Sequence, residues 1–300
     1  MSAPGSGPRL ACSTASVFTR PLRSIFALLA ETGFTGVEIM VTKDPATQEA
    51  RTLLELAEEH ALRIDAIHAP FLFITRTVWG TEPVGKIHRA IELAEHVGAP
   101  LVVVHPAYRW QAGYRRWLDE GLPGLARSTG VLVAVENMFP VRVLGRQVVT
   151  LHVKQSLKEL ECFPDVVLDT SHAAVAGVDL LEALGRLSAR LRHVHLSNNA
   201  GKGWDSHLPV DEGILDLDRF LDALAGSGFA GTVSLELDLR GRTADETELR
   251  EVLVRNRTFC ESRLAPSRGD LGSPSAHLEP GPLPRGQQGD RWNGITGRDV

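Results

Sequence analysis

Cysteine is scarce in this chain, and its few copies stand far apart. Cys12, Cys162 and Cys260 are the three cysteines among 300 residues. Such spacing fits neither a disulfide framework nor a zinc site built from paired cysteines. We therefore expect a protein of a reducing compartment whose fold needs no covalent cross-links.

Long apolar runs are missing as well. No segment approaches the ~18 consecutive apolar residues that a membrane-spanning helix requires. The first residues, MSAPGSGPRL, lack the charged head and apolar core of a secretory signal. Together these absences predict a soluble, cytoplasmic protein without a membrane partner.

Positive charge is not in excess. The 32 lysines and arginines are outnumbered by 37 aspartates and glutamates, which gives a net charge of -5. This balance gives no support to a strongly basic nucleic-acid surface, although a local basic groove can occur in an acidic protein.

What the chain does contain is one pattern repeated eight times, an apolar strand followed by an amphipathic helix. The expected strands are 9–15, 36–41, 62–68, 101–105, 131–137, 166–170, 191–196 and 232–238. The expected helices are 22–30, 45–60, 83–97, 111–128, 154–162, 179–189, 217–226 and 243–262. Apolar strands alternating with helices are typical of a parallel sheet covered by helices.

This pattern predicts an α/β fold, a (β/α)8 TIM barrel over residues 9–264. The alternative is an open doubly wound sheet, but no Gly-rich dinucleotide-binding motif follows the first strand. Residues 1–8 are expected to be flexible. Residues 265–300 are rich in glycine and proline and lack periodicity, which predicts a disordered tail.

Acids and histidines stand at the ends of these strands or soon after them. They are Glu38, His68, His105, Glu136, Asp169, His172, His195, Asp205, His207 and Glu236. In a barrel the carboxyl ends of the strands meet at one mouth, so these side chains are expected to lie close together. Several buried acids would repel one another strongly, and a divalent cation bound by carboxylates and imidazoles removes that repulsion. Histidine-rich ligation favours zinc or manganese, with magnesium or cobalt as alternatives.

Each of these residues also has an ordinary structural interpretation. A carboxylate at a strand end, such as Asp169, can cap the following turn, and a lone histidine can be a hydrogen-bonded core residue. Asn137, Asn198 and Lys202 are candidates for substrate binding, although both asparagines could instead hold loops. His193 is expected to point away from His195 and to pack against a helix.

Seven short motifs carry a resemblance to a known superfamily. They are HAP (68–70), VVVHP (102–106), VENM (135–138), LDTSH (168–172), HVHLSN (193–198), DSHLPVDEG (205–213) and LELD (235–238). Over residues 9–262 the chain resembles the xylose isomerase-like barrels, which include the sugar phosphate isomerases/epimerases and the endonuclease IV family of apurinic-site nucleases.

The epimerase side of the resemblance implies one metal held by Glu136, Asp169, His195 and Glu236, with His172 reaching the substrate. The two glutamates would also move protons, so that a sugar or sugar phosphate reacts through a metal-stabilised enediolate. A homo-oligomer would be compatible with this class of enzyme.

The nuclease side of the resemblance implies a larger ligand set. It adds His68, His105, His172, Asp205 and His207 to the four residues above and implies a multi-zinc site for phosphodiester hydrolysis at abasic sites in nucleic acid. Phe71 stands where that family has an aromatic residue that works on DNA. Against it stand the acidic net charge and the lack of basic clusters in the first three loops, with Arg142 and Arg146 the main candidates for a backbone contact.

We favour the isomerase or epimerase interpretation. A third hypothesis is a barrel that binds a metal and a sugar without catalysing a reaction.

Overall fold

The computed structural model describes residues 7–72, 75–125, 129–143 and 147–265. The predicted disordered tail, apart from Ala265, and most of the predicted flexible start lie outside the described residues.

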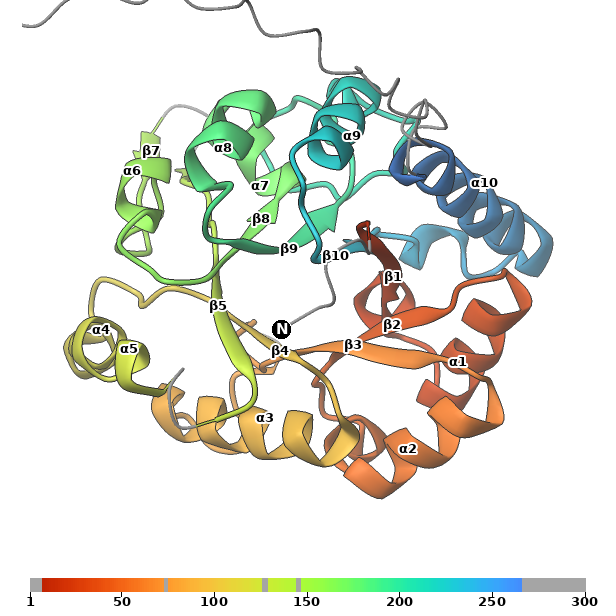
Figure 1. Ribbon diagram of the computed structural model, residues 1–300, viewed down its shortest axis with the longest axis horizontal. Coiled ribbons are helices and arrows are strands. Elements are labelled where there is room, and N and C mark those ends of the chain that lie inside the picture. The colour runs from red at the N-terminus through yellow and green to blue at the C-terminus, as the bar shows by residue number, and fades with distance from the viewer. Residues whose placement is uncertain (1–6, 73–74, 126–128, 144–146, 266–300) are drawn as a thin grey trace, which may run out of the picture. The chain divides into compact units, whose positions relative to one another are not determined.

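The core of the fold is a closed barrel of eight parallel strands, which confirms the predicted fold class (Figure 1). The strands are β1 (Arg9–Ser13), β2 (Gly36–Met40), β3 (Arg63–His68), β4 (Leu101–Val104), β5 (Leu132–Glu136), β8 (Val166–Asp169), β9 (Leu191–Leu196) and β10 (Thr232–Leu235). β1 pairs with both β2 and β10, which closes the cylinder and excludes the open doubly wound sheet.

Helices surround the barrel in a ring (Figure 1). They are α1 (Leu22–Glu31), α2 (Ala50–Glu59), α3 (Pro83–Val97), α4 (Ala112–Glu120), α5 (Leu122–Leu125), α6 (Leu157–Leu160), α7 (Thr170–Ala176), α8 (Leu180–Leu187), α9 (Leu217–Gly226) and α10 (Glu246–Leu264). Short 3-10 turns lie at Thr14–Val17, Pro45–Gln48 and Arg240–Arg242.

Helix α3 shows why the local sequence determines these boundaries. The Glu82 carboxylate accepts hydrogen bonds from the backbone N–H groups of Val84 and Gly85, and Pro83 occupies the first turn. Gly98 ends the helix in the left-handed conformation at φ 74°. The predicted helix 83–97 therefore matches the observed one.

The structure differs from the prediction mainly in the loops after β5 and β8. A two-stranded antiparallel hairpin, β6 (Val141–Val143) with β7 (Gln147–Val149), follows β5. Helix α7 follows β8 directly, because Asp169 caps its first turn and Gly177 ends it at φ 71°. The predicted helix 111–128 is divided into α4 and α5, and residues 126–128 lie outside the described residues.

The apolar core is continuous between the strands and the helices, with fully buried Phe26, Phe163 and Phe220 among its largest side chains. A smaller cluster of Ala66, Leu101, Val103, Ala134 and Val167 forms a second buried group of strand residues. Burial at this scale stabilises the barrel by roughly 25 cal/mol per Å² of apolar surface. Within the described ranges, no helix combines the length and the apolar character that crossing a bilayer demands.

Candidate metal centre

Seven barrel strands bring an acid or a histidine to the same end of the barrel. These residues are Glu38 on β2, His68 on β3, His105 just after β4, Glu136 on β5, Asp169 on β8, His195 on β9 and Glu236 just after β10. All but Glu236 are buried, and the Glu236 side chain is 15% exposed. The predicted convergence of these side chains is therefore present in the structure.

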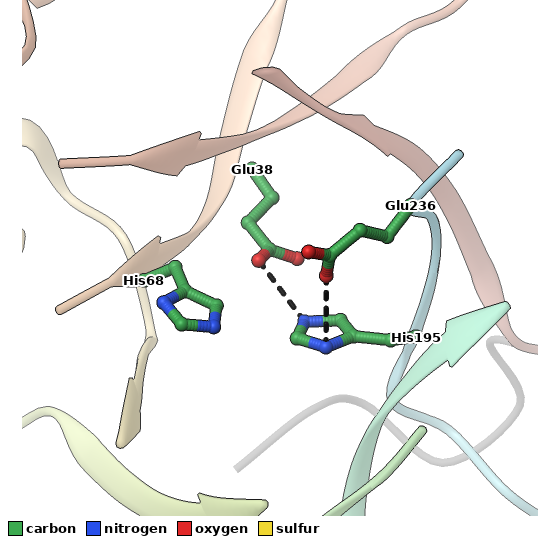
Figure 2. A group of neighbouring side chains, drawn as sticks. All are labelled: Glu38, His68, His195 and Glu236. Atoms are coloured by element: carbon green, nitrogen blue, oxygen red, sulfur yellow. Dashed lines mark hydrogen bonds and ion pairs between the residues drawn. The ribbon is translucent and has the colours of Figure 1, made fainter. Parts of the chain in front are cut away.

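His195 is the centre of a first donor set. Its Nδ1 atom lies 3.1 Å from Glu136 Oε1, 3.0 Å from Glu236 Oε2 and 3.8 Å from Asp169 Oδ2. Figure 2 shows Glu236 approaching this nitrogen, while Glu38 approaches the other nitrogen of the same ring. Three carboxylate oxygens thus lie near one nitrogen. Ligand atoms of Glu136, Asp169 and His195 lie within 4.8 Å of one another, and Glu236 forms a second such group with Glu38, His68 and His195.

Buried oxygens in this first set lack hydrogen-bond partners. Glu136 Oε2, Asp169 Oδ2 and Glu236 Oε2 accept no well-aligned hydrogen bond, although a histidine nitrogen lies 3.1 Å from Glu136 Oε2 and another lies 3.0 Å from Glu236 Oε2. Oδ1 of Asp169 accepts a hydrogen bond from the backbone N–H of His172 at 2.7 Å. Leaving such oxygens buried without a partner is costly. A divalent cation is the partner that a carboxylate-rich donor set fits, so the first set suits a metal ion.

A second donor set shares Glu136 with the first. The Oε2 atom of Glu136 lies 3.1 Å from His105 Nε2 and 3.5 Å from His68 Nε2. The Nδ1 of His68 lies 3.1 Å from the carbonyl oxygen of Ala69, which places the ring proton on Nδ1. The Nε2 lone pair of His68 is then free to face a cation beside Glu136.

A third donor set lies in the loop after β9. Asp205 Oδ2 is 3.3 Å from His172 Nε2 and 2.7 Å from His207 Nε2. Each of these rings donates its Nδ1 proton to a backbone carbonyl, that of Asn137 at 2.8 Å and that of Glu236 at 3.0 Å. Both Nε2 atoms therefore face Asp205 and, once they have lost their protons, are the ring nitrogens that a cation could bind.

The two glutamates of the first set have opposite electrostatic environments. Burial acts to raise the pKa of Glu136, but His195, His105 and His68 outweigh it and hold the pKa well below its ordinary value. Burial also raises the pKa of Glu236, and there the nearby histidines do not cancel the effect. Two carboxyl groups with separated pKa values are the usual basis for an acid and base pair.

A cavity of about 290 Å³ opens beside these donors. Its polar wall includes Glu136, His172 and Glu236, and its apolar wall is formed by Phe18, Leu72, Met138 and Phe139. Arg240 is the one lysine or arginine among the described residues that line it, and it is paired with Asp238 at 2.8 Å. Phe18 and Arg240 were not candidates from the sequence, because neither belongs to a strand end.

The predicted substrate-binding residues divide into one that lines the cavity, His172, and three that do not. Asn137 uses its amide to bridge β5 and β8: Oδ1 accepts from Asp169 N at 2.6 Å and Nδ2 donates to Asp169 O at 3.0 Å. Lys202 is exposed and lies over the ring of Trp204 at 5.9 Å. Asn137 therefore positions Asp169, and Lys202 does not line the cavity.

Asn198 holds the loop after β9 together. Its Oδ1 accepts from the N–H groups of Asn199 at 2.8 Å and Leu215 at 2.9 Å, and its Nδ2 donates to Val210 O at 2.8 Å. The same loop carries Asp205 and His207 of the third donor set. Asn198 thus acts on the site through the loop.

We expect Asn198→Ala to lower the free energy of unfolding by about 2–3 kcal/mol, because buried backbone donors and acceptors lose their partners. Chemical denaturation of the wild type and the variant measures this change. A loss below about 0.5 kcal/mol, the range of ordinary surface substitutions, would contradict the role given to Asn198.

The prediction for His193 is wrong. Alternate residues of a strand face the same side of the sheet, so His193 and His195 both point into the barrel. His193 is 1% exposed, and its Nε2 lies 2.8 Å from Glu38 Oε2. Its interior position could have been found by applying the two-residue period of β-strands.

The comparisons with known proteins agree with the fold. Residues 26–254 match the family model described as xylose isomerase-like TIM barrel. An uncharacterised protein of Mycobacterium leprae is 33% identical over 273 residues, covering 84% of this chain and 97% of the relative. An uncharacterised protein of Mycobacterium tuberculosis is 32% identical over 276 residues, and the match covers 85% of this chain and 98% of the relative.

Similar solved structures have different described activities. A D-tagatose 3-epimerase-like protein has a TM-score of 0.61 at 24% identity, covering 86% of this chain and 100% of its own. A 3-keto-D-glucoside 4-epimerase from E. coli has a TM-score of 0.61 at 20% identity, and the match covers 84% of this chain and 99% of that protein. An AP endonuclease of family 2 from Brucella melitensis has a TM-score of 0.62 at 22% identity, and the match covers 81% of this chain and 96% of that protein.

At these identities the solved structures establish the fold alone, whereas the family match spans most of the barrel. The chain belongs to the xylose isomerase-like TIM barrel family.

Proposed function

We propose that this protein is a divalent-metal-dependent isomerase or epimerase of a sugar or sugar phosphate. The observation that carries the proposal is the cavity of about 290 Å³ in which Glu136 and Glu236 meet an apolar wall. Its size suits a small molecule that is largely enclosed. Solved structures described as sugar epimerases have the same fold, which supports this substrate class.

Glu136, Asp169, His195 and Glu236 would hold the metal. Bound there, a zinc or manganese ion would supply Lewis-acid stabilisation of negative charge on the substrate oxygens. Glu136 and Glu236 then serve as the acid and base pair: one removes a proton from a carbon next to the carbonyl group, and the other returns one. Return to the opposite face inverts the carbon, while return to the neighbouring carbon isomerises the sugar.

Other residues orient the substrate and keep water out. His172 faces the cavity with its Nε2 atom beside Asp205, where it can contact a substrate hydroxyl group. The rings of Phe18 and Phe139 close the apolar side of the cavity. Exclusion of water protects a carbanion-like intermediate from unwanted protonation.

A second candidate is a multi-metal phosphodiesterase acting at abasic sites, and the second and third donor sets favour it. Against it, Arg240 is the single lysine or arginine among the described residues that line the cavity, whereas a protein that binds a nucleic-acid backbone needs several. Phe71 also packs against Tyr114, with ring centroids 5.7 Å apart, and lies 5.8 Å from His105. Arg142 and Arg146 have side chains outside the described residues.

Two assays on the metal-loaded protein separate these functions. We expect metal-dependent exchange of one carbon-bound proton with D2O in a panel of free and phosphorylated ketoses, and no nicking of a duplex with one abasic site. Nicking without exchange would overturn the proposal in favour of the nuclease. Ketose binding without exchange would identify a non-catalytic barrel and would equally overturn it.

Metal binding should release protons and strengthen with rising pH. Burial lowers the pKa of His195, but Glu38, Glu236 and Glu136 outweigh it and hold the pKa well above its ordinary value, so the ring is protonated at neutral pH without a metal. Because a ligand must lose its proton, the affinity should rise about tenfold per pH unit for each proton released. Calorimetric titration with zinc between about pH 6 and 8, in buffers of different ionisation enthalpy, tests this, and a pH-independent affinity would contradict it.

Two pKa shifts in the third donor set determine how the stability of the metal-free protein depends on pH. Burial lowers the pKa of His207, but Asp205 and Asp169 outweigh it and raise the pKa to about 10. This raised pKa contributes stability below the unfolded value of about 6.5, and the contribution is lost as the pH rises towards 10. Burial raises the pKa of Asp205, but His172 and His207 outweigh it, so the pKa falls far below its ordinary value. That contribution is present above about pH 4 and is lost on further acidification. The metal-free barrel should be most stable between about pH 4 and 6.5, as thermal melts across pH would show.

A further inference from the structure

Glu38 is a buried carboxylate that the proposed chemistry leaves without a role. It lies on β2 at 0% exposure, and the partners of its two oxygens are both histidines of β9. Oε1 lies 3.0 Å from His195 Nε2, and Oε2 lies 2.8 Å from His193 Nε2. A buried negative charge is costly unless it has such partners, so its presence at the centre of the barrel calls for a function.

The position of Glu38 relative to His195 indicates the function of this buried carboxylate. A neutral imidazole has one N–H donor and one lone pair, on opposite sides of the ring. Glu38 faces Nε2, whereas Glu136, Asp169 and Glu236 gather around Nδ1, and Figure 2 shows this division for Glu38 and Glu236. Because an ionised carboxylate only accepts hydrogen bonds, Nε2 carries a proton that Glu38 accepts. Nδ1, which faces the first donor set, is then the nitrogen whose lone pair a cation in that set would bind.

A direct role as metal ligand is the competing explanation. Glu38, His68, His195 and Glu236 offer ligand atoms within 4.8 Å of one another. A metal on the Nε2 side of His195 would, however, take the Glu38 oxygen away from the ring and turn Nδ1–H towards Glu136 and Glu236. It would also leave Asp169 Oδ2, a buried oxygen without a partner, outside the coordination sphere.

We propose that Glu38 and His193 are positioning residues for the metal centre. His193 donates its Nε2 proton to Glu38, and Glu38 accepts the Nε2 proton of His195, which fixes the tautomer, the ring orientation and the basicity of Nδ1. The rings of His193 and His195 lie 5.1 Å apart at 88°, so one carboxylate bridges two histidines of one strand. This inference rests on the metal site of the proposed function and does not depend on the substrate.

The test compares zinc affinity and histidine tautomers in the full chain. In Glu38→Gln the shape is kept and the charge is lost, so we expect zinc affinity measured by chelator competition to fall about 10–100-fold. The ¹⁵N shifts of the imidazole nitrogens of zinc-loaded wild type should show His195 protonated at Nε2 and metal-bound at Nδ1. The metal-free wild type should keep a proton on Nε2 of His195, whereas the metal-free variant should carry its imidazole proton on Nδ1, a difference that a merely structural residue would not produce.

A matched pair at His193 keeps the proposal testable if Glu38→Gln fails to fold. His193→Gln retains a side-chain N–H at the position of Nε2 and should keep the zinc affinity within a few-fold of the wild type, whereas His193→Met removes the donor and should lower it about tenfold. Equal affinities in the pair, or unchanged affinity and tautomer in Glu38→Gln, would overturn the proposal. So would a His195 ring that binds zinc through Nε2, since Glu38 would then be a ligand. Tight zinc binding without ketose exchange would instead contradict the proposed function and leave this inference intact.

Discussion

Glu136→Gln should abolish ketose proton exchange. Glu136 is the one acid shared by the first and second donor sets, with Oε1 near His195 and Oε2 near His105 and His68. Glutamine keeps the size of the side chain but can neither accept the substrate proton nor supply charge to a cation. Loss of proton transfer alone costs roughly 10²–10⁴-fold in rate, and weaker metal binding adds to it.

The controls for this variant separate chemistry from folding. Glu236→Gln should also abolish exchange, because the proposed mechanism needs both carboxylates. Glu95→Gln, at an exposed position on α3, should exchange at the wild-type rate. Full exchange in either Glu136→Gln or Glu236→Gln, measured by deuterium incorporation at saturating metal, would remove the two-glutamate mechanism.

Removal of the metal should lower activity to background and destabilise the barrel. Without a cation, buried oxygens of Glu136, Asp169 and Glu236 have no hydrogen-bond partner. A metal that binds only the folded state adds about 4 kcal/mol to the free energy of unfolding at a free concentration of ~1,000 times its Kd. Denaturation in the presence of a chelator and after resaturation with zinc or manganese measures this difference.

The choice of cation adds a control to this experiment. Imidazole-containing donor sets prefer zinc or manganese to calcium, which takes oxygen ligands. Zinc or manganese should therefore restore both stability and exchange, and calcium should restore neither. Equal stability in the chelated and the resaturated protein would show that the cluster binds no structural or catalytic cation.

The barrel could be predicted from the sequence because its signals are local and repeated. The strands 191–196 and 232–235 are short apolar runs, and helix α3 is marked by Pro83 and Gly98 at its ends. Helix α7 was not predicted, because its sequence, TSHAAVA, is only seven residues long and has no clear helical period of apolar residues. Its start depends on the Asp169 carboxylate, which the pattern of strand-end acids and histidines predicts as a metal ligand.

The site could be predicted only in part. The ends of the strands can be located from the sequence, whereas the conformation of the loops cannot. The rule that strand ends meet at one mouth identified residues such as Glu136, Asp169 and His195 without any contact information. The asparagines show the limit of that rule: Asn137 and Asn198 stand beside site residues, yet their amides bind backbone groups. Arg240 reaches the cavity from a 3-10 turn whose path no periodicity indicates.

Anomalous diffraction from crystals of the zinc- or manganese-loaded protein tests the central claim most directly. The account predicts a metal peak bonded at about 2.0–2.3 Å to Glu136, Asp169, Glu236 and the Nδ1 atom of His195. Metal peaks confined to other parts of the molecule, or none at all in protein soaked at saturating metal, would contradict it.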